Sequence, residues 1–297
     1  MRSAEALAAL LIARIDAISQ AAGHIESDEI TKVDGLKSRI IEDPLISVDI
    51  SAEDTFEVEG NPQDICISIL RDYYFGWKRV QQQWQSTVRL AEDQNHVAWT
   101  VVSSYYCAYF CALEILRIHG RFPLSLAEDS AGAMFGRATG VKKSEFLQKK
   151  HTNFIGYLAP DFSKITYKAS GIRPHQFAWQ EFSNSIFSKF PNRISDWDEL
   201  HKFQNICSGR RGWQTPSEIR NRWNYRDSLY FSSLGISSAQ PFLKLLANPG
   251  SSSKWIRQVA KANSEADCIS SLAAITQFLF GAVHESYTDS LASIVNF

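Results

Sequence analysis

The most hydrophobic part of the chain is residues 95–120, where apolar positions cover nearly the whole circumference of a helix. Small residues are set there between aromatic ones. The small residues are Ala98, Ser103, Ser104, Ala108 and Ala112, and the aromatic ones are Trp99, Tyr105, Tyr106, Tyr109 and Phe110. A helix without a clear polar face is normally surrounded by other helices. The pattern therefore predicts the central helix of a helical bundle.

Other segments repeat apolar residues at the three- and four-residue spacing of a helix. They are residues 3–22, 62–91, 144–158, 196–207 and 264–296, with shorter helices at 238–248 and 254–262. Two of these helices have start signals: Asn61 before Pro62, and Asp196 with Glu199 three residues later. The segment Thr215-Pro216-Ser217-Glu218 indicates the start of one further helix. Such residues cap the free N–H groups of a first helical turn.

Residues 23–64 interrupt the helical pattern. The Asp43-Pro44 step and the alternation of apolar and polar residues that follows it indicate extended segments or a small hairpin on the surface. We therefore predict an all-α fold with two parts. Residues 1–61 form an N-terminal helix with a small irregular or hairpin extension, and residues 62–297 form a helical-bundle domain.

Composition narrows the functional classes. The formal net charge of −1 provides no overall field that would attract nucleic acid or an anionic membrane. The five cysteines are odd in number and lie mostly in apolar runs, which favours free buried thiols in a reducing compartment. Residues 98–116 are long enough to span a membrane, but their serines, threonine and Glu114 favour a soluble core. We expect a cytoplasmic protein outside the membrane.

Charge is unevenly distributed along the chain. Residues 26–64 contain twelve acids and three bases, whereas residues 189–226 contain eight bases and four acids. Ordinary variation over a protein surface is one interpretation. The other is an anion-binding site in the basic segment and a partner-contacting surface in the acidic one.

Two motifs, about a hundred residues apart, belong together. The first comprises Ser104, Tyr105, Tyr106, Ala108, Phe110, Ala112 and Leu116, and the second comprises Arg220, Asn221, Asn224 and Tyr225. A Tyr-Tyr-Ala helix followed by an arginine-led helix resembles the HEPN superfamily of compact helical bundles. The resemblance covers about residues 65–290. It implies a homodimer and, as in the ribonucleases of that superfamily, RNA cleavage without a metal ion.

The second motif departs from the ribonuclease pattern. In that pattern a histidine follows the Arg-polar pair after four variable residues, but Arg226 occupies its place here. Arginine stays protonated at neutral pH and cannot act as the base that histidine supplies. It can still bind a phosphate and stabilise a charged transition state, and the hydroxyl of Tyr225 could donate a proton.

Three interpretations of this segment remain open. Its side chains could only cap and bridge helices, with Arg220 beside Asn224 and Arg222 beside Arg226. They could bind phosphate or RNA without turnover, or they could form a variant ribonuclease site. In the last case Arg220, Asn221 and Tyr225 are the candidate catalytic residues. The candidate nucleic-acid-binding residues are Arg210, Arg211, Arg222, Asn224 and Arg226.

No other catalytic pattern occurs in the chain. Sequences typical of nucleotide-binding loops, zinc proteases and serine hydrolases are missing. Cys107 and Cys111 are one helical turn apart and could begin a metal site. His119 lies two turns further along, and nothing else completes a set of four ligands, so we expect no metal or other cofactor. Of the dispersed histidines, His96 or His201 could approach the arginines in the fold.

The sequence thus predicts a HEPN-like component of a prokaryotic toxin or phage-defence system. Its expected activity is metal-independent RNA cleavage through Arg220 and Tyr225. The alternative is a non-catalytic subunit that binds nucleic acid or a protein, using the acidic segment and the N-terminal helix for contact. RNA, a second copy of the chain and a protein encoded nearby are the expected partners.

Overall fold

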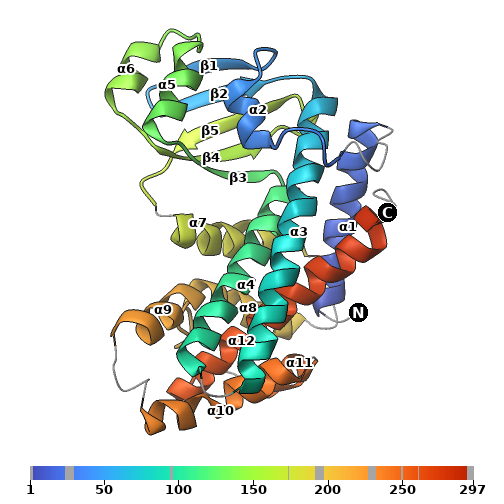
Figure 1. The fold of residues 1–297 in the computed structure, drawn as a ribbon, viewed down its shortest axis with the longest axis vertical. Coiled ribbons are helices and arrows are strands. Elements are labelled where there is room, and N and C mark those ends of the chain that lie inside the picture. The colour runs from blue at the N-terminus through green and yellow to red at the C-terminus, as the bar shows by residue number, and fades with distance from the viewer. Residues whose placement is uncertain are drawn as a thin grey trace. The chain divides into compact units, whose positions relative to one another are not determined.

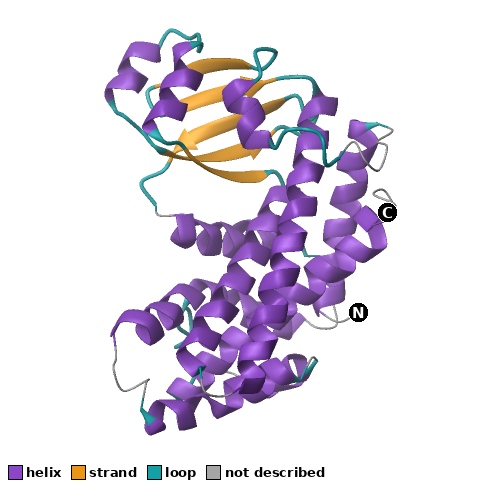
Figure 2. Cartoon of the chain, viewed as in Figure 1, coloured by secondary structure: helices purple, strands orange, loops and turns teal. Residues whose placement is uncertain are grey.

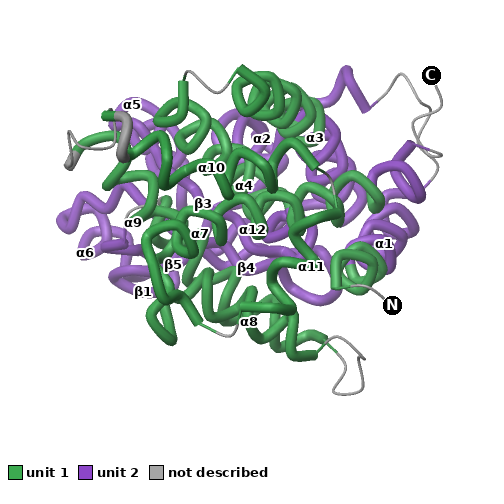
Figure 3. Tube along the Cα trace, turned by 90° about the horizontal axis from the view of Figure 1, so that it is seen from below, with its two compact units in different colours: residues 1–10, 76–114, 175–286 green, residues 11–75, 115–174, 287–297 purple. Residues whose placement is uncertain are grey.

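The computed structural model describes residues 3–23, 30–93, 96–172, 174–190, 197–226, 232–248, 250–259 and 261–292. The chain divides into two compact units, coloured separately in Figure 3. Unit 1 comprises residues 1–10, 76–114 and 175–286, and unit 2 comprises residues 11–75, 115–174 and 287–297. The expected domain boundary at residue 61 lies at the start of α3 (Pro62–Asp93) and stays a prediction.

Unit 2 contains a five-stranded antiparallel sheet with the strand order β1-β2-β5-β4-β3 (Figures 1 and 2). The strands are β1 (Ser47–Ala52), β2 (Thr55–Glu59), β3 (Arg121–Ser125), β4 (Asn153–Leu158) and β5 (Lys164–Ala169). The protein is therefore mixed α and β, and the prediction of an all-α fold is wrong. The expected hairpin is confirmed as β1 and β2, but it forms one side of this larger sheet, and its expected position on the surface is wrong because Ile50, Phe56 and Val58 are fully buried.

The helix predicted over residues 144–158 is also wrong. The helix found there, α6 (Lys143–Gln148), is short, and Lys150 after it has a φ of 47°. A left-handed residue cannot continue a right-handed helix. The chain then enters β4, where Phe154 and Gly156 are buried on one face. Gly156 leaves room for the ring of Tyr167 on β5, because an added Cβ would lie 2.5 Å from that ring.

Aromatic side chains form the core of unit 2. Helices α2 (Leu36–Glu42), α5 (Glu128–Gly136) and α6 cover one face of the sheet (Figure 1). Phe56 on β2 stacks on Tyr167, with ring centroids 4.9 Å apart. Phe135 from α5 and Phe146 from α6 meet the Phe56 ring edge-on, at 5.2 Å and 6.0 Å. Edge-to-face packing of this kind stabilises aromatic cores beyond the area that it buries.

The acidic segment is partly neutralised in space. Lys149 bonds Glu53 at 2.9 Å, Lys164 bonds Glu57 at 3.1 Å, and Arg39 bonds Asp64 at 3.1 Å. Exposed pairs such as these add little stability, but they reduce the net charge of the surface. Glu26, Asp28 and Glu29 lie outside the described residues, and binding of a protein partner here stays a prediction.

The described elements of unit 1 are all helical. They are parts of α1 (Ser3–Ala22), α3 and α4 (Val97–Ile118), followed by α7 (Pro174–Glu181), α8 (Trp197–Ser208), α9 (Pro216–Asn221), α10 (Ser233–Ala247), α11 (Ser251–Gln258) and α12 (Glu265–Ser286). The predicted central helix is confirmed as α4, although Asn95 lies outside the described residues. Asp196, the capping residue expected for α8, lies outside them as well.

Small polar residues allow close packing around α4. Gln83 of α3 donates to the carbonyl and hydroxyl oxygens of Ser103, at 3.1 Å and 2.8 Å. On another side of α4, the hydroxyls of Ser104 and Thr276 of α12 are 2.9 Å apart. Helix α4 and the segment Glu265–Leu291 are long and apolar enough to span a membrane, but 78% and 72% of their most hydrophobic windows are buried inside the protein. Core helices of soluble proteins have the same properties.

One glycine permits the contact between α3 and α4. A Cβ added to Gly76 would lie 2.1 Å from Cδ of Glu114, whose carboxylate is fully buried and bonds Arg79 at 2.9 Å. We expect Gly76→Ala to lower the free energy of unfolding by about 1–3 kcal/mol through overpacking. Gly281→Ala on α12 is the matched control, because its added Cβ would be an ordinary 3.8 Å from Ala4. Denaturant unfolding that gave both variants the same stability would contradict this close packing.

Candidate functional site

Helix α9 begins with the capping arrangement that the sequence predicts. The hydroxyl of Thr215 accepts a hydrogen bond from the Glu218 N–H at 3.3 Å, and the Glu218 carboxylate accepts one from the Thr215 N–H at 2.7 Å. Pro216 occupies the first helical position. These bonds satisfy N–H groups that a helix start leaves free. They fix the first turn of α9, and with it the positions of Ser217 and Arg220.

A π-helical turn, residues Arg222–Arg226, follows α9 directly. Side chains five residues apart are neighbours in a π-helix, and such turns are frequent at functional sites. Accordingly, Cζ of Arg220 lies 6.0 Å from the ring centroid of Tyr225. The ring of Tyr225 is 72% exposed. The wider turn therefore places an exposed tyrosine beside Arg220, which the expected α-helical spacing would not do.

The guanidinium of Arg220 lies against aromatic rings. Its Cζ is 4.9 Å from the ring centroid of Tyr105 and 5.8 Å from that of Tyr106, both on α4. Its Nε is buried without a hydrogen-bond partner, and no carboxylate among the described residues bonds it. Rings attract a guanidinium over their faces without using its N–H donors. Arg220 thus keeps its charge and donors for an anionic ligand.

A histidine from a distant part of the sequence completes this group. The Tyr105 hydroxyl is 2.9 Å from Nδ1 of His175 on α7 and 3.2 Å from the hydroxyl of Ser217. The imidazole stacks on Tyr109, with centroids 4.3 Å apart. We call Tyr105, Tyr109, His175, Ser217 and Arg220 the Arg220 cluster. All five residues belong to unit 1.

The surroundings of His175 favour its neutral form. Burial lowers the pKa of the imidazole below its ordinary 6.5, and the positive charge of Arg220 lowers that pKa further. Burial also raises the pKa of Tyr109 to about 12, so the stacked phenol stays protonated. A histidine whose pKa is below neutrality can accept a proton at pH 7.

This electrostatic coupling can be measured without any substrate. In Arg220→Gln the repulsion disappears, so we expect the pKa of His175 to rise toward 6.5 while burial still holds it somewhat below. An NMR titration of the histidine ring protons would follow the change. His96, which lies 3.5 Å from Asp93 and outside the Arg220 cluster, is the internal reference, because its surroundings do not change in the variant. An unchanged His175 pKa would show that Arg220 is not close to the imidazole.

Among the described residues, the remaining candidates of the sequence motif and the loop before it do not join the Arg220 cluster. Arg222 bonds Glu265 at 2.8 Å, so its charge is already paired. Asn221 and Asn224 are half-buried next to the cluster in sequence, whereas Arg210 and Arg211 are exposed in the loop before α9. The side chain of Arg226 lies outside those described. Of the candidate residues, the structure brings together Arg220 and Tyr225.

Neither of the histidines singled out from the sequence, His96 or His201, contacts Arg220 in the described part of the chain. His96 pairs with Asp93, and Nδ1 of His201 lies 2.9 Å from the Asn205 amide nitrogen. His175 was not among the candidate residues predicted from the sequence. Its one local signal is the position directly after Pro174, which opens α7 and places the histidine in the first turn of a helix.

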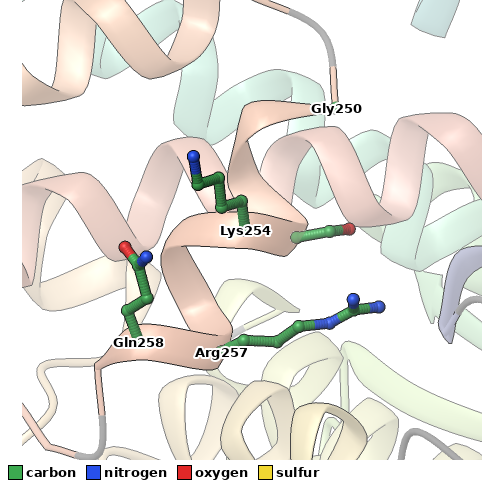
Figure 4. Close-up of a pocket in the computed structure, with 5 residues that line it drawn as sticks. Gly250, Lys254, Arg257 and Gln258 are labelled. Atoms are coloured by element: carbon green, nitrogen blue, oxygen red, sulfur yellow. The ribbon is translucent and has the colours of Figure 1, made fainter.

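No group of three or more His, Cys, Asp or Glu side chains suited to a metal ion occurs within the described part of the chain. The prediction of free buried thiols is confirmed for all five cysteines. A pocket of about 420 Å³ lies beside α11, and Figure 4 shows Lys254, Arg257 and Gln258 projecting there from that one helix. Arg257 is already bonded to Glu199 at 2.8 Å. This pocket contains no residue of the Arg220 cluster.

Comparison with known proteins adds no relative. No protein-family model matches the chain, and no curated protein or solved structure matches it.

Proposed function

We propose that the protein is a metal-independent endoribonuclease whose active site is the Arg220 cluster together with Tyr225. The observation that carries the proposal is the hydrogen bond between Tyr105 and His175, beside a guanidinium that no described carboxylate neutralises. The sequence motif lacks a histidine at its expected position. His175, brought in by α7, can take over the role of that residue.

His175 is the proposed general base. Tyr105 can accept a hydrogen bond from the Nδ1–H of His175 and donate its own proton to Ser217, because the three groups are within 2.9 Å and 3.2 Å. This tautomer leaves the Nε2 lone pair free for a proton. The imidazole then removes the proton from a ribose 2′-hydroxyl, and the 2′-oxygen attacks the adjacent phosphorus.

Arg220 and Tyr225 act on the other side of the reaction. The guanidinium binds the phosphate oxygens and stabilises the extra negative charge that develops on them. The bond from phosphorus to the 5′-oxygen breaks, and the Tyr225 hydroxyl gives that oxygen a proton. The products are a 2′,3′-cyclic phosphate and a 5′-hydroxyl end. Water then takes the proton from His175 and gives a proton to Tyr225, which restores both side chains to their starting forms.

The resemblance to the HEPN superfamily supports the same proposal. The sheet belongs to unit 2, whereas all the matching residues except Leu116 belong to unit 1, whose described elements are helical. The proposed setting, a prokaryotic toxin or phage-defence system, rests on that resemblance. So does the proposed homodimer, for which light scattering should return twice the 33.5 kDa mass of the chain.

The direct test is cleavage of total RNA by the purified protein in the presence of EDTA. We expect cleavage to survive chelation, to fall by roughly 10²–10³-fold in Arg220→Ala and to be strongly reduced in Tyr225→Phe. Cleavage that EDTA abolishes would refute the metal-independent mechanism. If the protein binds RNA but cuts none under any condition, it is a non-catalytic binding subunit and the enzyme proposal fails.

A further inference from the structure

We infer that Arg79 is a second phosphate-binding residue, and that Tyr106 and Phe110 stack the bases of a single-stranded RNA between Arg79 and Arg220. We call these four residues the aromatic row. The inference rests on the proposed function for the chemical nature of the ligand. It goes further by assigning a strand path that begins at the Arg220 cluster.

The row is continuous along α4. Cζ of Arg220 lies 5.8 Å from the ring of Tyr106, the rings of Tyr106 and Phe110 are 5.9 Å apart, and Cζ of Arg79 lies 4.2 Å from the ring of Phe110. Both rings are half-buried, one helical turn apart. A guanidinium therefore flanks each end of an aromatic pair. All four residues belong to unit 1.

A buried carboxylate, that of Glu114, orients the guanidinium of Arg79. Its Nη2 donates to Oε1 of Glu114 at 2.9 Å, and the Glu114 side chain is fully buried. The Arg79 side chain is itself 47% exposed. An arginine guanidinium has five N–H donors, and the bond to Glu114 uses one of them. The remaining donors can bind a phosphate, with the planar group already oriented by the carboxylate and the ring of Phe110.

Alternating arginines and rings match the chemistry of a single strand. Each nucleotide presents a phosphate for a guanidinium and a base face for an aromatic ring, and such stacking tolerates any sequence. In a duplex the base faces are covered by their neighbours. A second copy of the chain would have to bring one of its own carboxylates to Arg220, because within one chain no described carboxylate bonds this guanidinium, whereas an RNA strand brings a phosphate with every nucleotide.

The test measures the affinity for a fluorescent single-stranded oligoribonucleotide and for the duplex of the same sequence, over a range of salt concentrations. The His175→Asn background prevents cleavage during the measurement. Arg79→Ala would leave Glu114 buried and unpaired, which destabilises proteins. The informative variants are therefore Arg79→Lys and the double variant Arg79→Gln with Glu114→Gln. The third variant is Phe110→Leu. The control is Arg89→Gln, because Arg89 is an exposed arginine on α3, the helix that also carries Arg79.

We expect the double variant and Phe110→Leu each to weaken single-strand binding by at least about five-fold. The double variant should also reduce the slope of log affinity against log salt by about 0.7, the value for one lost phosphate contact on a single strand. Arg79→Lys should keep that slope but lose affinity, because lysine cannot supply the planar fork. The control should match the parent, and thermal unfolding should show that every variant is folded.

The outcomes separate this inference from the proposed function. Cleavage of RNA with unchanged affinity in the double variant and in Phe110→Leu would overturn the aromatic row and leave the enzyme standing. Row-dependent binding without any cleavage would support the row and refute the enzyme. If Phe110→Leu instead converts a dimer to a monomer and leaves RNA affinity unchanged, the row is a surface between two copies and the inference is wrong.

Discussion

Replacing His175 with asparagine is expected to lower the rate of RNA cleavage by roughly 10²–10⁴-fold, the usual contribution of a general base. Asparagine can keep a hydrogen bond to Tyr105, so the local packing should survive. It has no basic nitrogen and cannot accept the 2′-hydroxyl proton. Binding of RNA should change little, because the phosphate is held by Arg220. Single-turnover kinetics with a labelled oligoribonucleotide measure both quantities.

The matched control is His96→Asn, because His96 is paired with Asp93 outside the cluster. This variant should cleave RNA at the parental rate. The pH profile provides a second check. The pKa of His175 is lowered below 6.5, so the imidazole stays neutral and active as pH falls to 6.5, and activity is lost only below that value. A His175→Asn protein that cleaves at the parental rate would exclude His175 as the base.

Replacing Arg220 with lysine should cost about as much as replacing it with alanine, roughly 10²–10³-fold in the rate of cleavage. Lysine keeps the positive charge, but it has neither the planar group that lies 4.9 Å from the Tyr105 ring nor a fork that binds two phosphate oxygens. The loss should appear at saturating RNA, because the developing charge of the transition state needs both bonds.

Arg89→Lys is the corresponding control on an exposed arginine of α3 and should leave the rate unchanged. The two Arg220 variants should differ in one respect. Arg220→Ala removes the charge that lowers the pKa of His175, so the acidic limb of its residual activity should move toward 6.5. Arg220→Lys should keep that limb nearly in place. Full activity in Arg220→Lys would mean that only a point charge is required, and would contradict the bidentate contact.

Local signals predicted the helices around the site well. The apolar circumference predicted over residues 95–120 identified α4 (Val97–Ile118), because a helix buried on all sides needs no polar face. The segment Thr215-Pro216-Ser217-Glu218 identified the start of α9, since its capping bonds join residues only three positions apart. Asn61 likewise accepts a hydrogen bond from the Gln63 N–H at 3.1 Å, as expected for the start of α3. Short-range hydrogen bonding determines each of these features.

The sheet could not be predicted in the same way. Strand β3 contains Pro123, a residue that normally argues against a strand, and β4 places Gly156 at a buried position where a hydrophobic residue is expected. Their pairing with the hairpin joins segments about a hundred residues apart, such as Phe56 and Tyr167. Lys149 and Lys150, just before β4, also fit the polar face of an amphipathic helix, which favoured the wrong prediction of a helix there. These strands are specified by their tertiary contacts.

The candidate site was predicted only in part. Arg220 and Tyr225 follow from a recognisable motif, whereas His175 meets Tyr105 across 70 residues of sequence. Periodicity and spacing carry no information about such a contact. The π-helical turn at Arg222–Arg226 was equally hidden, and it changes the neighbour of Arg220 from Asn224 to Tyr225. The ion pair between Arg222 and Glu265 could not be predicted either, because only the fold brings these two residues together.

The central claim, that the Arg220 cluster cleaves RNA through the 2′-hydroxyl, is tested most directly by the ends of the products. Mass spectrometry of an oligoribonucleotide incubated with the protein in EDTA should reveal 2′,3′-cyclic phosphate and 5′-hydroxyl ends. The same oligonucleotide with one 2′-deoxy substitution should resist cleavage at that position. Products with 5′-phosphate ends, or cleavage at the 2′-deoxy position, would contradict the mechanism.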